Sequence, residues 1–61
     1  MTDRQAWVKA LTTIRAWSKL VATGYSDQIG LQIGLLDQYA ELCLLSNVLG
    51  RNIPKWVKRK I

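Results

Sequence analysis

Apolar residues recur at steps of three and four through the first third of the chain, which is the pattern of an amphipathic helix. The pattern begins after Thr2, which stands three residues before Gln5 as in a capping box. It ends before Gly24, a residue that suits a helix C-terminus. We therefore predict a helix over residues 3–22, whose buried stripe consists of Trp7, Ala10, Leu11, Ile14, Trp17 and Val21.

A second helical pattern, over residues 28–49, follows a short connection in which Ser26 or Asp27 can serve as the N-cap. It contains two apolar stripes displaced around the helix axis, and only a narrow non-apolar face. One stripe comprises Ile29, Ile33, Leu36, Ala40 and Cys43, the other Leu31, Leu35, Leu42 and Leu49, and the narrow face Gly30, Gly34, Asp37, Gln38 and Glu41.

A helix that is apolar on most of its circumference must be covered from more than one side. One amphipathic neighbour and a short third helix do not suffice, so we expect self-association or a protein partner. Gly30 and Gly34, four residues apart, would open one face to close helix approach. The residues expected at such an interface are Gly30, Ile33, Gly34, Leu44 and Leu45. In the alternative interpretation, residues 25–34 are partly irregular and the helix begins near Leu35.

The end of the chain predicts a short third helix. Gly50 closes the second helix, Asn52 suits an N-cap, and Pro54 is tolerated in a first turn because its missing N–H would be unpaired there. We place this helix at 53–60, with Ile53, Val57 and Ile61 on its inner side. No sustained alternation predicts a strand. The expected fold is a single all-α domain over residues 1–61, an antiparallel helical hairpin with a third helix across it.

Positive charge is concentrated at the C-terminal end of the chain. The chain carries nine Lys and Arg against four Asp and Glu, for a net charge of +5. Residues 1–50 carry four cations and four acids, so the excess of positive charge lies in residues 51–61. Trp56 lies among these cations, one helical turn from Lys60, close enough for a cation–π contact.

Basic groups around an indole suit a phosphate backbone with accessible bases. We therefore predict a nucleic-acid or anion-binding surface formed by Arg51, Lys55, Trp56, Lys58, Arg59 and Lys60. Residues 40–61 fit the spacing of a helix-turn-helix motif only loosely, because Pro54 stands where a recognition helix would begin. A purely structural interpretation is that these cations complement the helix dipole and that Trp56 completes the core.

Composition excludes several other functions. Histidine is absent and there is one cysteine, so no internal disulfide can form and no metal-ligand cluster is expected. Asp37 and Glu41 share a helical face but have no accompanying base or phosphate-binding loop, so we expect no catalytic site, no cofactor and no enzymatic activity. Cys43 is expected to be a buried thiol in a reducing cytosol. No secretory signal is evident, and Gln32, Asp37 and Glu41 interrupt the most apolar run, so we expect a cytoplasmic protein without a membrane span.

Three functional hypotheses follow. The first is a nucleic-acid-binding module, which could be a homo-oligomer. The second is a helical adaptor or inhibitor that binds a larger protein through the apolar second helix. The third is a membrane-active peptide, since small size, positive charge and three tryptophans resemble leaderless bacteriocins. The four acidic residues and the electrically neutral first fifty residues depart from that class, so a membrane surface is the least favoured partner.

Overall fold

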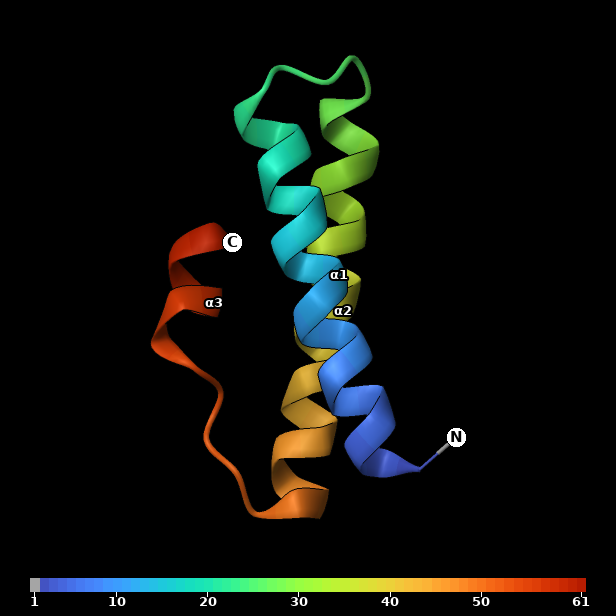
Figure 1. Cartoon of the computed structure of the whole chain (residues 1–61), viewed down its shortest axis with the longest axis vertical. Coiled ribbons are helices and arrows are strands. Elements are labelled where there is room, and N and C mark those ends of the chain that lie inside the picture. The colour runs from blue at the N-terminus through green and yellow to red at the C-terminus, as the bar shows by residue number, and fades with distance from the viewer. Residues whose placement is uncertain (1) are drawn as a thin grey trace.

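Three helices make up most of the protein. The structure, a computed structural model, describes residues 2–61 and contains α1 (Asp3–Ala22), α2 (Gln28–Leu49) and α3 (Lys55–Lys60), with no strand in that range. In Figure 1, α1 rises from the N-terminus, α2 returns alongside it, and α3 lies beside the pair. The all-α, three-helix prediction is confirmed. No helix within residues 2–61 is both long and apolar enough to cross a membrane.

The ends of α1 are defined by local hydrogen bonds. The Thr2 hydroxyl accepts from the Gln5 N–H at 3.2 Å, and the Gln5 side-chain oxygen accepts from the Thr2 N–H at 3.0 Å. This is the predicted capping box, which pairs N–H groups that the helix itself leaves free. At the other end Gly24 takes a left-handed conformation, with φ of 78°. Such a φ is strained in residues with a Cβ, and this explains why the chain turns there.

The helix α2 runs unbroken through both of its glycines. The Asp27 carboxylate accepts from the Gly30 N–H at 3.0 Å and caps the first turn. Gly50 closes the last turn in the left-handed region. The alternative with an irregular segment up to residue 34 is therefore wrong, because the cap and the packing of α2 on α1 outweigh the helix-breaking tendency of two glycines.

The third helix begins at Lys55, two residues later than predicted. Pro54 has φ −57° and ψ 142°, which is extended backbone, and it occupies the N-cap position without a side-chain hydrogen bond. The physical reason lies in the residue before the proline: the Pro54 ring disfavours helical backbone at Ile53. Asn52 consequently does not cap a helix.

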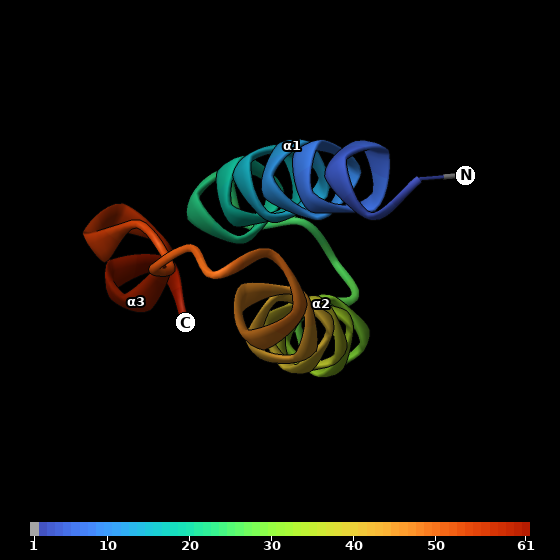
Figure 2. The ribbon, with the colours of Figure 1, turned by 90° about the horizontal axis from the view of Figure 1, so that it is seen from below.

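The core lies where α1, α2 and α3 meet. It consists of Trp7, Ala10 and Ile14 from α1, Leu35, Leu42 and Leu45 from α2, and Val57 from α3. Partly buried side chains pack around it, among them Leu11, Trp17, Val21, Leu49, Ile53 and Trp56. The stripe predicted for residues 3–22 is therefore the buried one. Figure 2, seen along the hairpin, shows α3 to one side of α1 and α2.

Two residues predicted at an intermolecular interface are used inside the molecule instead. Gly34 faces the ring of Trp17, and a Cβ at Gly34 would overlap that ring. The close approach that this glycine permits is thus between α2 and α1 of the same chain. Leu45 belongs to the core. Cys43, expected to be buried, is a free thiol that is half-buried, because it stands one residue away from the buried Leu42 and therefore about 100° around the helix from it.

Candidate nucleic-acid interface

The most concentrated group of cations surrounds Trp56. The guanidinium carbon of Arg15, on α1, lies 5.4 Å from the centroid of the Trp56 ring, on α3. This is a cation–π contact, and it differs from the predicted one, in which Lys60 was the cation. The contact joins two helices that are 33 residues or more apart in the chain, so it fixes where α3 sits on α1.

An open hollow of about 370 Å³ lies between α1 and α3 at this point. Arg15, Ser18 and Lys19 line it from α1, and Trp56 and Lys60 line it from α3. Arg15 and Lys19 are four residues apart, as are Trp56 and Lys60, so each pair lies on one face of its helix. We refer to these five residues as the cationic hollow. It combines three positive charges, a hydroxyl and an indole.

The remaining cations of residues 51–61 point in other directions. Val57 is fully buried, which sets the rotation of α3. Lys55 and Arg59 then lie nearly opposite Val57 and face solvent, while Lys58 lies on the flank away from Trp56. All three are exposed.

Arg51 is separated from the other cations. It lies in the connection at the end of α2, where its N–H donates to the Ser46 carbonyl at 3.1 Å. The Ser46 hydroxyl in turn donates to the Arg51 carbonyl. The connection then runs back along the hairpin before α3 begins (Figure 1). Of the six residues predicted to bind anions, Trp56 and Lys60 line the hollow, Lys55 and Arg59 adjoin it on the outer face of α3, and Lys58 and Arg51 lie apart.

The four acidic residues lie away from the cationic hollow. Asp3 is in the first turn of α1 and Asp27 caps α2, positions where the helix dipole favours a negative charge. Asp37 and Glu41 line a separate hollow between α1 and α2, together with Lys9. No acid therefore neutralises the cations around Trp56 from within that hollow.

Among residues 2–61, the cationic head groups of the hollow donate no hydrogen bond to another part of the protein. In residues 2–61, every side-chain hydrogen bond uses a threonine, serine, glutamine or aspartate side chain. Arg15, Lys19 and Lys60 are exposed and keep their donor groups available to a ligand.

Sequence reasoning missed Arg15 and Lys19 as members of this surface. Summing charges over residues 1–50 cancelled them against acids that lie elsewhere in the fold. The sequence did contain a signal for them, since the two cations stand four residues apart on the polar face of α1. They lie in the C-terminal half of α1, and α3 packs alongside that half (Figure 1).

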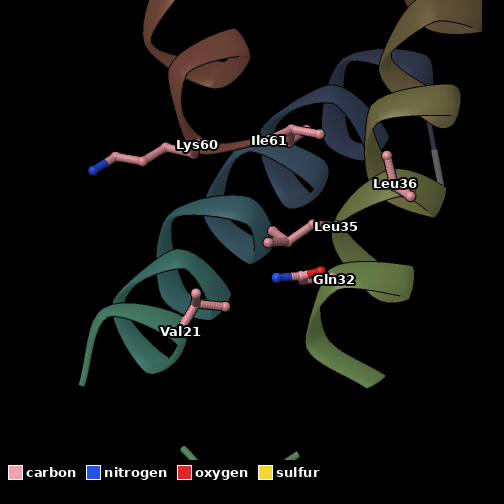
Figure 3. A pocket seen from close by; sticks show the side chains of 6 residues that line it. All are labelled: Val21, Gln32, Leu35, Leu36, Lys60 and Ile61. Carbon is pink, nitrogen blue, oxygen red and sulfur yellow. The ribbon is translucent and has the colours of Figure 1, made fainter. Parts of the chain in front are cut away.

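Lys60 also borders a second, mainly apolar hollow of about 190 Å³ (Figure 3). Val21, Leu35, Leu36 and Ile61 provide its apolar lining. In Figure 3 the Lys60 ammonium points away from these residues, while Ile61 reaches toward α2. The side chain of Lys60 is thus directed out of the apolar hollow, as expected for a long cationic side chain.

A second surface of a different character covers the outward side of α2. Ile29, Ile33, Leu36, Leu44 and Val48 are between 56% and 75% exposed. Together with Ala40, also exposed, they recur at steps of three and four along one side of the helix, opposite the buried Leu35 and Leu42. We refer to these six residues as the outer stripe. Of the predicted interface residues, Ile33 and Leu44 belong to it, whereas Gly30 lies at its edge beside the Asp27 cap.

Within residues 2–61 there is no group of three or more Cys, Asp or Glu residues that could hold a metal ion. Comparison with known proteins adds no relative: no family model, curated protein or solved structure matches this chain.

Proposed function

We propose that the protein is a non-enzymatic nucleic-acid-binding module that contacts the phosphate backbone through the cationic hollow and the adjoining outer face of α3. The observation that carries the proposal is that Arg15 and Lys19, from α1, stand with Lys60 around Trp56. This grouping requires the folded chain and has no counterion from the protein's own acids.

The chemistry of the surface favours phosphate chains over other anions. Three cations around one open hollow can approach successive phosphates, which releases counterions and stabilises the complex. Lys55 and Arg59 extend the positive surface beyond the hollow. Trp56 holds the Arg15 guanidinium over its ring, which keeps that cation beside Lys19 and Lys60. Nothing in the arrangement supplies a base-reading element in a groove, so we propose binding with little sequence preference.

The test is fluorescence anisotropy with labelled single-stranded and double-stranded oligonucleotides of mixed sequence, over a range of salt concentrations. We expect the logarithm of the association constant to fall linearly with the logarithm of salt, with a slope of about −0.9 per phosphate contact for duplex DNA and about −0.7 for single strands. No binding at low salt, or a slope near zero, overturns the proposal. Binding to anionic lipid vesicles in place of nucleic acid also overturns it.

The chain offers a matched pair of variants that locates the binding surface. K19Q/K60Q removes two charges from the cationic hollow, whereas R4Q/K9Q removes two from the N-terminal half of α1. Both lower the net charge by two. We expect K19Q/K60Q to reduce the salt slope by one to two units, since each lost phosphate contact removes about one, and R4Q/K9Q to change it little. Equal effects would mean that net charge alone attracts the nucleic acid, and the assignment of the surface would be wrong.

A second candidate function rests on the outer stripe. An apolar surface of this length on a small protein marks an interaction site, and a larger protein could cover it. In that case the chain would act as a helical adaptor or inhibitor. Whether the stripe needs such a partner depends on whether a second copy of the chain can cover it.

A further inference from the structure

The outer stripe of α2 is long, continuous and free of charge. Ile29 and Val48, at its ends, are 19 residues apart, which corresponds to about 28 Å along a helix. None of its six residues carries a charge, although Asp37, four residues after Ile33 and three before Ala40, borders the stripe on the flank where Glu41 and Lys9 lie. Within residues 2–61 the chain packs on the opposite side of α2, through Leu35, Leu42 and Leu45, and of the stripe only Leu36 also borders the apolar hollow beside Ile61.

The spacing of the stripe is nearly symmetric about Ala40. Leu36 and Leu44 lie four residues before and after it, and Ile33 and Val48 lie seven before and eight after it. Ala40 is itself close to the middle of α2, which spans Gln28–Leu49. A two-fold axis through Ala40 would therefore place Leu36 of one helix against Leu44 of another copy, and Ile33 against Val48.

We propose that the occupant of this stripe is a second copy of the chain, with the two α2 helices packed antiparallel and crossing at Ala40. In a two-fold dimer the same patch serves both subunits, so it must be self-complementary. The symmetric spacing meets that requirement, and the small side chain at its centre lets the two helix backbones approach closely.

The available area agrees with a dimer of modest stability. The five large side chains of the stripe expose on the order of 500 Å² of apolar surface in total. Burying this apolar surface would remove up to about 500 Å² from water on each subunit, which is less than the roughly 800 Å² per subunit of a standard stable interface and agrees with a dimer of modest stability. Each α2 would then be covered on two opposite sides, as its mainly apolar circumference demands.

The proposed interface leaves the cationic hollow exposed. The hollow lies between α1 and α3, whereas the stripe lies on the side of α2 that faces away from α1. Dimerisation and nucleic-acid binding should consequently respond to salt in opposite directions. Salt weakens phosphate contacts, but it screens the repulsion between two subunits of charge +5 and favours the dimer.

Solution mass tests the proposal without nucleic acid. We expect light scattering and sedimentation at tens of micromolar protein to give twice the monomer mass of 6.9 kDa. A40R should be monomeric at least at tenfold higher concentration. A16R, which makes the same substitution at an exposed position on α1, should remain dimeric. Circular dichroism checks that both variants keep their helices.

Cross-linking tests the orientation. In a C43S background, L36C and L44C alone should form disulfides slowly, while an equal mixture should yield the mixed 36–44 dimer. Cross-linking of each variant with itself would indicate parallel helices and overturn the antiparallel arrangement. A wild-type monomer at millimolar concentration, or an A40R variant that still dimerises, overturns the proposal as a whole. A monomer whose stripe binds a different protein would support the adaptor function instead.

Discussion

The helices α1 and α2 are nearly equal in length, 20 and 22 residues, and each contributes three buried side chains to the core they share. Their outward sides differ. α1 presents mainly lysine, arginine and threonine to solvent, with Val8 and Leu20 as isolated apolar exceptions, whereas α2 presents a row of isoleucine, leucine and valine beside Asp37 and Glu41. Water solvates the cationic side of α1, so this side needs no other element to cover it. The outer stripe of α2 is apolar and exposed, so the core that α1 and α2 share buries only one of the two apolar sides of α2.

The largest expected effect is a difference in stability between two leucine-to-alanine variants on opposite sides of α2. L42A removes a fully buried side chain and should cost about 2–5 kcal/mol, because it leaves a cavity. A domain of this size has roughly 3–9 kcal/mol of stability in total, so L42A should lose about half of it. L44A, on the outer stripe, should change the stability of the monomer by less than about 0.5 kcal/mol.

Urea denaturation followed by circular dichroism, at protein concentrations low enough to exclude association, measures both. Equal destabilisation by L42A and L44A would show that the outer stripe is packed within the monomer, and the contrast between the two sides of α2 would fail.

The difference between the buried and the exposed side of α2 also shows what the sequence could and could not predict about the fold. The bounds of α1 and α2 were predictable because the Thr2 and Asp27 caps and the Gly50 terminator are local signals. Which of the two apolar stripes of α2 faces inward was not, since both have helical spacing. That choice depends on tertiary contact, namely the Trp17 ring against Gly34.

The candidate site was predictable only in part, for a similar reason. Trp56 and Lys60 were identifiable because the C-terminal charge excess is a property of a continuous segment. Arg15 and Lys19 join them only through the packing of α3 on α1. Conversely, Lys58 and Arg51 belong to the same basic segment but point elsewhere, because Val57 and the extended Pro54 determine the rotation and the start of α3.

The next effect in size tests the close contact between α1 and α2. In G34A the new methyl group would overlap the Trp17 ring, so the indole or the helix must move. We expect a loss of about 1–3 kcal/mol, as for other overpacked sites, reduced by up to about 1 kcal/mol because alanine favours a helix.

G30A is the matched control on the same helix. Its methyl group would meet the Asp27 carboxylate, which is a movable side chain rather than a packed ring. Loss of that cap, about 1 kcal/mol, and the gain in helix propensity should nearly cancel. Thermal denaturation of both variants measures the difference. If G30A loses as much stability as G34A, contact with the Trp17 ring is not the reason that residue 34 must lack a side chain.

The smallest effect concerns the outward side of α1, where Arg15 stacks on Trp56. Removing the cation in R15Q should destabilise the protein by about 0.5–1 kcal/mol, the value of an exposed cation–π contact. R15K keeps the charge but lacks the planar group that stacks on the ring, so its stability should fall between R15Q and wild type. R59Q, on the solvent side of α3, is the control for loss of one charge. Chemical denaturation of the four proteins measures these differences.

The same variants separate two roles of Arg15. If the residue only holds α3 in place, R15K and R15Q should weaken nucleic-acid binding in proportion to their loss of stability. If its charge also contacts phosphate, R15K should bind nearly as the wild type does, while R15Q should show a salt slope smaller by about one unit. A variant R15Q that is as stable as wild type and binds as tightly would show that Arg15 contributes neither to the packing of α3 nor to a phosphate contact, and Lys19 would then be the one cation through which α1 contributes to the cationic hollow.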